Sequence, residues 1–294
     1  MQRSFILFIA AFMLAFGCSK PNQPVQALTP KPAPALLVDF PTLSMGGLSF
    51  EQKSAFVQIV NEEACPCDLP QTFAACLAPQ SSCKLAPVLA QWLIDRLKEG
   101  IPSSIMAEPL AKEINLGLNQ NPQIVDVDGY AYKGSKKPRY TIVEFADFEC
   151  FHCKDAAAAL DTWLKNHSKD VKVVFKHFPL PSHTMAKQAA IAAEAAAEQG
   201  KFWPMHDALF ANQQKLTDTL FLELAKKIGL NLSRFKKDLS NPRVLTRVEN
   251  SIKEGTLLGI EGTPALFFNG RQYFLSLDAK GFDLRFELEK ARGL

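Results

Sequence analysis

The 294-residue sequence has no long run of one charge, and its longest apolar stretch is short. Lys and Arg number 33 against 30 Asp and Glu, and the two signs are interspersed, so no basic face indicates a nucleic-acid partner. The longest apolar run, residues 5–16, falls short of the roughly 20 residues that span a hydrocarbon core. The composition, 47% hydrophobic and 21% charged, is that of a folded globular chain of about two domains.

The N-terminus has the pattern of an export signal. Arg3 precedes the apolar run, which predicts a signal peptide over residues 1–17. The small residue before Cys18 resembles a bacterial lipoprotein signal, so Cys18 is the candidate lipid acceptor. Ordinary cleavage that leaves a free thiol, or a cytosolic chain, are the alternatives. Prolines predict an extended tether over residues 18–42. We therefore expect a periplasmic or cell-envelope protein attached to a membrane by lipid.

Helical patterns precede the main domain. Ser49 and Gln52 fit a capping box, and apolar residues after them recur at helical spacing. A second apolar pattern covers residues 85–98, and a third covers 104–118. We therefore predict a small helical cysteine-rich segment over residues 43–120.

Four cysteines lie within nineteen residues of that segment: Cys65, Cys67, Cys76 and Cys83. They fit two structural disulfides, which suit an exported segment with a small core. A bond between Cys65 and Cys67 closes a strained ring, which leaves a nested or a staggered pairing. A zinc site is disfavoured because only one close pair exists, so no metal is expected. A redox-active Cys65–Cys67 pair stays open.

The other two cysteines form the motif Cys150-Phe151-His152-Cys153, between a β-rich run and an apolar helical pattern. A helix N-terminus there presents unpaired N–H groups and partial positive charge, which stabilise a thiolate. A lowered pKa makes Cys150 a nucleophile and a good leaving group, and His152 places further positive charge nearby. Lys154 stands where haem attachment requires histidine. The motif predicts a redox-active dithiol that uses no cofactor.

Several segments carry a family resemblance. The sequence VEFADFECFHC at 143–153 is similar to the active-site segment of DsbA-type thiol-disulfide oxidoreductases of the thioredoxin superfamily. VKVVFKHFPL at 171–180 resembles the next strand of that family, and GIEGTPALFFNGR at 259–271 resembles its cis-proline strand. The resemblance implies an α/β thioredoxin-like fold over 121–294 with a helical insertion at about 182–258.

The resemblance also assigns roles to single residues. It makes Cys150 the attacking sulfur and Cys153 the buried resolving one. Thr263 and Pro264 match the cis-proline pair, whose loop lies beside the dithiol in this family and whose backbone pairs with substrate peptide.

A buried charged pair is implied as well. Glu144, six residues before Cys150, matches the acid beneath the active site, and Lys176 matches its basic partner. Together they would tune proton transfer to Cys153. A solvent-facing strand residue is the alternative for Glu144.

The resulting functional prediction is an exported thiol-disulfide oxidoreductase that oxidises client proteins and depends on a membrane redox partner. Two features argue against a fixed prediction that electrons flow from client to enzyme. Phe151 stands where the family often has proline, and threonine before Pro264 also resembles disulfide isomerases and reductases. A reductase or isomerase kept reduced by a membrane partner, relaying through Cys65 and Cys67, is therefore the second prediction. A non-catalytic lipoprotein that uses a thioredoxin-like fold is the third.

Overall fold

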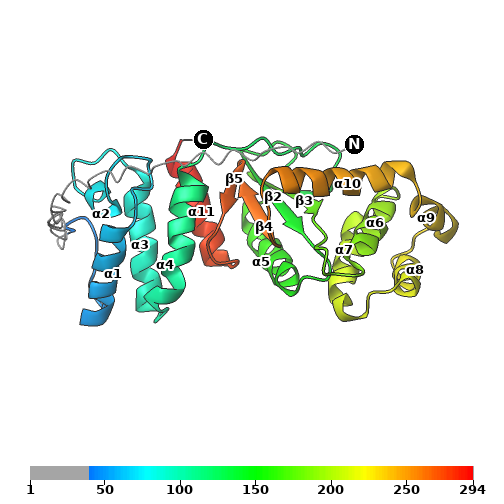
Figure 1. The fold of residues 1–294 in the computed structure, drawn as a ribbon, viewed down its shortest axis with the longest axis horizontal. Coiled ribbons are helices and arrows are strands. Elements are labelled where there is room, and N and C mark those ends of the chain that lie inside the picture. Colours follow the sequence, from blue (N-terminus) through cyan, green and yellow to red (C-terminus); the bar gives the residue numbers. More distant parts are fainter. Residues whose placement is uncertain (1–39, 294) are drawn as a thin grey trace, which may run out of the picture. The chain divides into compact units, whose positions relative to one another are not determined.

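The computed structural model describes residues 40–293, which all belong to one compact unit (Figure 1). The predicted signal peptide at 1–17, most of the tether and the candidate lipid acceptor Cys18 lie outside the described residues. Within residues 40–293, no helix combines the length and the apolar character that a membrane crossing requires.

A five-stranded mixed sheet forms the centre of the fold. Its strand order is β1-β3-β2-β4-β5, with β2 and β3 parallel and the other neighbours antiparallel. Nearly every residue of β2 and β3 is buried, as expected for a parallel pair covered on both faces. The strands are β1 (Tyr132–Gly134), β2 (Tyr140–Ala146), β3 (Val171–His177), β4 (Ala265–Phe268) and β5 (Arg271–Tyr273).

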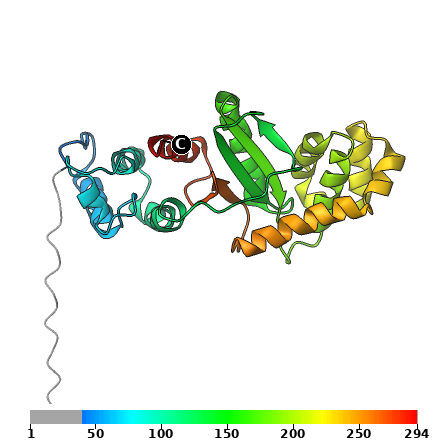
Figure 2. The same ribbon diagram turned by 90° about the horizontal axis from the view of Figure 1, so that it is seen from above.

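Helices cover both faces of the sheet. α5 (Phe151–His167) connects the parallel strands β2 and β3, which need a crossover of this kind. It packs against α11 (Ala279–Ala291). The chain between β3 and β4 is almost wholly helical and contains α6 (Ala186–Ala197), α7 (Phe202–Ala211), η2 (Gln213–Lys215), α8 (Asp218–Lys227), α9 (Leu232–Asp238) and α10 (Pro242–Leu257). α10 contacts both α6 and β3, so it joins the inserted helices to the sheet (Figure 2). The expected α/β fold with a helical insertion is confirmed.

The cysteine-rich segment also forms helices. They are α1 (Phe50–Glu62), α2 (Phe73–Cys76), α3 (Leu85–Lys98), α4 (Ser103–Lys112) and the π-helix η1 (Glu113–Leu118). The capping box predicted for α1 is present, with Gln52 N donating to Ser49 Oγ at 3.2 Å. The single helix expected over 104–118 instead changes to π geometry at Glu113. α3 packs on α11 and η1 on β5, so one core continues from this segment into the sheet domain.

A fully buried ion cluster fastens η1 to the sheet domain. Arg285 of α11 pairs with Glu113 of η1, and its Nε donates to Glu289 at 3.0 Å. Glu113 also accepts a hydrogen bond from the backbone N–H of Phe274 at 2.8 Å. Gly117 allows the close approach, because a Cβ there would lie 2.8 Å from the Gln272 carbonyl oxygen. The π turn therefore places a buried carboxylate against its counter-ion.

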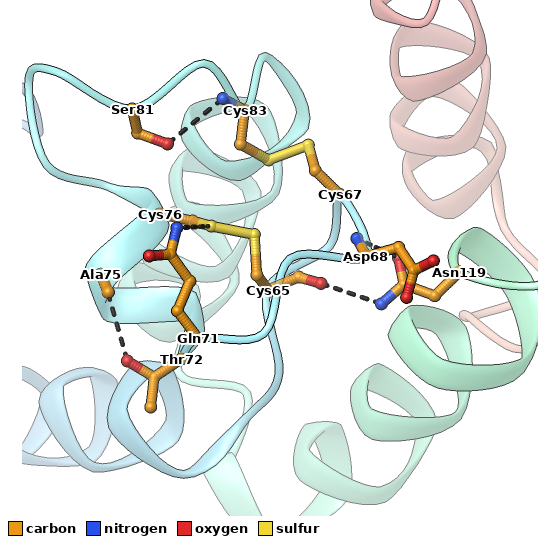
Figure 3. The surroundings of a disulfide bond; sticks show 10 residues. All are labelled: Cys65, Cys67, Asp68, Gln71, Thr72, Ala75, Cys76, Ser81, Cys83 and Asn119. Atoms are coloured by element: carbon orange, nitrogen blue, oxygen red, sulfur yellow. Dashed lines mark hydrogen bonds between the residues drawn. A yellow bond between two sulfur atoms is a disulfide. The ribbon is translucent and has the colours of Figure 1, made fainter.

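The four cysteines of the segment form two disulfides, Cys65–Cys76 and Cys67–Cys83 (Figure 3). This is the staggered pairing, one of the two arrangements left open by the sequence. The redox-active Cys65–Cys67 pair is not formed, because each sulfur is bonded to a different, more distant cysteine. The predicted electron relay through a Cys65–Cys67 disulfide is therefore wrong for a chain with this disulfide pairing. All four sulfurs are held in disulfides, so they are not the thiolates that a zinc site needs.

Candidate functional site

The Cys150–Cys153 dithiol lies where β2 gives way to α5. Cys150 is the N-cap residue of α5, and Cys153 lies in its first turn. Both are free thiols in this structure. Cys150 is 7% exposed and Cys153 is 0% exposed, so Cys150 is the one residue of the two with any exposed surface. The junction of strand and helix predicted for the motif is observed.

Hydrogen-bond donors around Cys150 stabilise its thiolate. They lower the pKa of Cys150 to about 5, with the Cys153 thiol contributing most. The backbone N–H groups of Cys153 and His152 at the start of α5 act in the same direction, while burial opposes them. At neutral pH the Cys150 sulfur is therefore an anion.

Cys153 has the opposite environment. Its Sγ is enclosed, and burial raises the pKa of this thiol far above its usual range. The backbone N–H of Asp147 lies 3.4 Å from the Cys153 sulfur, but that donor does not offset the burial. Cys153 thus remains a protonated donor to the Cys150 thiolate. The Cys150 sulfur is therefore the nucleophile, and the buried Cys153 sulfur stays protonated.

The predicted cis-proline pair lies beside the dithiol. The Thr263–Pro264 peptide bond is cis, and the Thr263 carbonyl oxygen is 3.2 Å from Cys150 Sγ. Pro264 directly precedes β4, which pairs with β2, the strand that leads into the motif. The sheet therefore brings together two segments that are more than a hundred residues apart in the sequence.

The loop before Cys150 is held by a buried carboxylate that sequence reasoning missed. Asp147 accepts hydrogen bonds from the backbone N–H groups of Glu149 and Leu180 and from His183 Nδ1, each at 2.7 Å. The contacts join the end of β2 to the loop after β3. A polar residue just before the motif was visible in the sequence, but two of its three partners, Leu180 and His183, lie more than 30 residues away.

Gln213, from the insertion, is a second residue that the sequence did not identify. Its Nε2 donates to the backbone carbonyls of Phe148 at 2.9 Å and Cys150 at 2.7 Å. The helical insertion therefore fixes the backbone on the other side of the motif. No pattern in the sequence around Gln213 indicates this contact.

The predicted partnership of Glu144 and Lys176 is wrong. Glu144 registers with Phe175 across the β2–β3 pair, and Lys176 registers with Phe145 one residue further. Because successive strand residues point to opposite faces, the two charged side chains lie on opposite sides of the sheet. Lys176 instead pairs with Glu254 of α10.

Glu144 itself is buried, at 3% exposed, so the solvent-facing alternative does not hold. Burial, reinforced by the Asp161 carboxylate and opposed by Lys133, raises the pKa of Glu144 to about 8. Its Oε1 has no hydrogen-bond partner among the described residues. A neutral carboxyl at physiological pH is the consequence.

The two residues between the cysteines face outward. Phe151 is 62% exposed, and the His152 ring lies against it with the ring centres 5.9 Å apart. His152 assists the Cys150 thiolate through its backbone N–H. An exposed aromatic side chain thus stands next to the reactive sulfur.

Comparison with known proteins places the chain in a family. A family model described as thioredoxin matches residues 127–284, more than half of the chain. The chain belongs to the thioredoxin family. The matched region begins ahead of β1 and ends within α11, so it includes the whole sheet, the dithiol and the cis-proline loop.

Solved structures agree on the fold. BdbD from Bacillus subtilis matches with a TM-score of 0.50 at 22% identity, over 59% of this chain and 98% of that one. Alpha-DsbA1 from Wolbachia pipientis also has a TM-score of 0.50, at 18% identity over 58% of this chain and 96% of that one. The expected resemblance to DsbA-type proteins is confirmed at the level of the fold.

Curated relatives bear another name. The Na(+)/H(+) antiporter NhaA 3 of Salinispora tropica is 37% identical over 186 residues, which are 63% of this chain and 28% of the antiporter. The antiporter of Herminiimonas arsenicoxydans is 36% identical over 148 residues, or 50% and 24% of the two chains. The chain spans about a quarter of the length of these relatives, so their transport function is not transferred to it.

Proposed function

We propose that the chain is a thiol-disulfide oxidoreductase that exchanges disulfides with client proteins through Cys150. The observation that carries the proposal is the pairing of an outer sulfur whose pKa is about 5 with a buried, protonated sulfur in the next turn. This arrangement separates an attacking sulfur from a resolving one. Family membership and the neighbouring Thr263–Pro264 loop support it.

In the oxidising direction, a client thiolate attacks Cys150 Sγ in the Cys150–Cys153 disulfide. A client–Cys150 disulfide forms, and the electron pair leaves on Cys153, which takes a proton. A second client thiolate then attacks the client sulfur of the mixed disulfide and displaces the Cys150 thiolate. The client loses two electrons and the enzyme gains them. Cys150 is a good leaving group because its thiolate is stable at neutral pH.

Oxidation is the favoured direction, because stabilising the Cys150 thiolate stabilises the reduced enzyme and makes the disulfide form a stronger oxidant. The test is the equilibrium reduction potential of Cys150–Cys153. A value of about −120 mV supports an oxidant. A value of about −270 mV supports the reductase or isomerase and overturns the proposal that the chain oxidises its clients. Oxidised full-length chain should also transfer its disulfide to a reduced, unfolded model protein, and Cys150→Ser should abolish the transfer.

Client binding is proposed at the Thr263–Pro264 loop and the exposed Phe151. An extended client segment would pair with the loop backbone, while the aromatic ring would contact apolar client side chains. Phe151→Ser should raise the KM for an unfolded client more than it changes the rate with a small disulfide. Equal effects on both substrates would contradict a docking role for Phe151.

Export and lipid attachment are proposed from the sequence of residues 1–17 and Cys18. The clients are then exported proteins, and a membrane redox partner restores the enzyme after each turnover. Mass measurement of the mature N-terminus should find a lipidated Cys18, and Cys18→Ala should move the chain from the membrane fraction to the soluble fraction. An unmodified N-terminus in cell-derived protein would contradict lipid attachment.

A further inference from the structure

The two disulfides of the cysteine-rich segment lie against each other. The sulfur atoms of Cys65, Cys67 and Cys83 are all within 4.8 Å of one another, although Cys65 is bonded to Cys76 (Figure 3). The loop that carries Cys65 is held by Asn119, whose Nδ2 donates to the Cys65 carbonyl at 2.9 Å. A thiolate released from one of the two disulfides is therefore close enough to attack the other.

The cluster has one accessible sulfur residue. Cys65, Cys76 and Cys83 are all buried, at 4% exposed or less, whereas Cys67 is partly exposed. Cys67 lines a cavity of about 420 Å³. A thiol from solution therefore meets Cys67 before any other sulfur of the cluster.

The cavity is basic. Lys84, Arg271 and Arg292 line it together with a single acid, Asp68. Within residues 40–293, none of these three cations forms an ion pair. Arg292 also has a buried Nε without a hydrogen-bond partner, and its pKa is lowered by burial and by the neighbouring charge of Arg271. Arg271 and Arg292 also donate hydrogen bonds to the backbone carbonyls of Gln120 and Leu118. Three cations and one acid beside a disulfide favour an anionic ligand.

We propose that this cavity admits a small thiol carrying carboxylate groups, and that the thiolate of this ligand attacks Cys67 Sγ. The Cys67–Cys83 bond breaks, a mixed disulfide forms between Cys67 and the ligand, and the electron pair leaves on Cys83. This site is separate from Cys150 and Cys153 in residues and in chemistry. The inference therefore goes beyond the proposed function and does not depend on it.

A second exchange follows from the spacing of the sulfurs. The Cys83 thiolate attacks Cys65 Sγ, forms a Cys65–Cys83 disulfide and displaces the Cys76 thiolate, which then takes a proton from water. Gln71 supports this product, because its Nε2 lies 2.9 Å from Cys76 Sγ and donates to it. Neither step changes the number of disulfides. One ligand thiol is bound at Cys67, and the free thiol has moved to Cys76.

The test uses the full-length chain with Cys18→Ser, Cys150→Ser and Cys153→Ser, so that the four cysteines of the second site are the only ones left. The folded protein is incubated with glutathione, quenched with acid, alkylated and mapped by mass. We expect glutathione on Cys67 and the alkyl label on Cys76. Absence of an adduct, or an adduct on another cysteine, would overturn the site. A label confined to Cys83 would overturn the second exchange.

The role of charge is tested by comparing glutathione with neutral 2-mercaptoethanol. Each reaction rate is divided by the concentration of the thiolate form of that reagent. Lys84→Gln and Arg271→Gln should each lower the glutathione rate about tenfold and leave the 2-mercaptoethanol rate unchanged. Lys253→Gln, an exposed lysine elsewhere, is the matched control and should change neither rate. Equal losses with both thiols, or no loss with glutathione, would overturn the anionic ligand. Failure here would leave client transfer through Cys150 untouched.

Discussion

The assignment of Cys150 as a stabilised thiolate is tested most quantitatively by one difference. It is the difference in unfolding free energy between reduced and oxidised protein, measured as a function of pH. The folded, reduced chain holds the pKa of Cys150 at about 5, against 9.0 for an ordinary thiol. A lowered pKa means that the unfolded state binds more protons between these values, so stability rises with pH. The stabilisation is fully present above pH 9 and is lost as the pH falls to 5. The oxidised protein has no such titration.

The magnitude follows from the size of the shift. Each pH unit well above the folded pKa is worth about 1.4 kcal/mol, and at pH 5 half of the Cys150 thiol is already ionised. The free energy of unfolding of the reduced form should therefore gain about 2 kcal/mol relative to the oxidised form between pH 5 and pH 7. Glu144 acts in the other direction. Its pKa is raised to about 8, so stability falls as the pH rises from 4.5 to 8. Glu144 is present in both redox forms, and its contribution cancels in the difference.

The assay is urea unfolding at pH 5, 6 and 7 of the oxidised chain and of a chain reduced only at Cys150–Cys153, with the other two disulfides verified by mass mapping. Thiolate absorbance at 240 nm should give a midpoint near pH 5 that is missing in Cys150→Ser. A constant difference in stability between pH 5 and 7, or an absorbance midpoint above about pH 8, would refute the reasoning.

Two further outcomes are expected. In the oxidised parent chain, Glu144 should lower the free energy of unfolding by about 1.4 kcal/mol per pH unit between pH 4.5 and 8, and Glu144→Gln should abolish this loss. The same pH dependence of the unfolding free energy in variant and parent, measured by urea unfolding, would argue against a buried neutral acid. Arg285→Met leaves the carboxylates of Glu113 and Glu289 buried without their cation and should cost about 3–5 kcal/mol of unfolding free energy, whereas a loss below about 1 kcal/mol would contradict the ion cluster.

Features governed by local rules were predictable from the sequence. The capping box at Ser49 sets the start of α1, and the strand-to-helix junction places Cys150 at the N-terminus of α5. The cis-proline pair followed from the family resemblance and is present at Thr263–Pro264. The first two depend on short segments with recognisable local patterns, and the third on a motif that the family resemblance supplied.

Features that depend on distant segments were not predictable. The staggered disulfides arise from how α2 and the loops around it pack, which spacing alone left undecided. The error over Lys176 comes from a one-residue difference in strand register, which moves a side chain to the other face of the sheet. Asp147 and Gln213 act through partners brought close by the fold, so their own neighbours in sequence carry no sign of the contact.

The most direct test of the central claim is capture of a client by the Cys153→Ala chain, in which no sulfur remains to resolve the mixed disulfide. The full-length variant is mixed with a disulfide-containing unfolded model protein, and the covalent product is mapped by mass. The account predicts a disulfide between the client and Cys150, and no product when Cys150→Ala is added. Failure of the Cys153→Ala chain to form a covalent complex, or attachment of the client through Cys67, would contradict it.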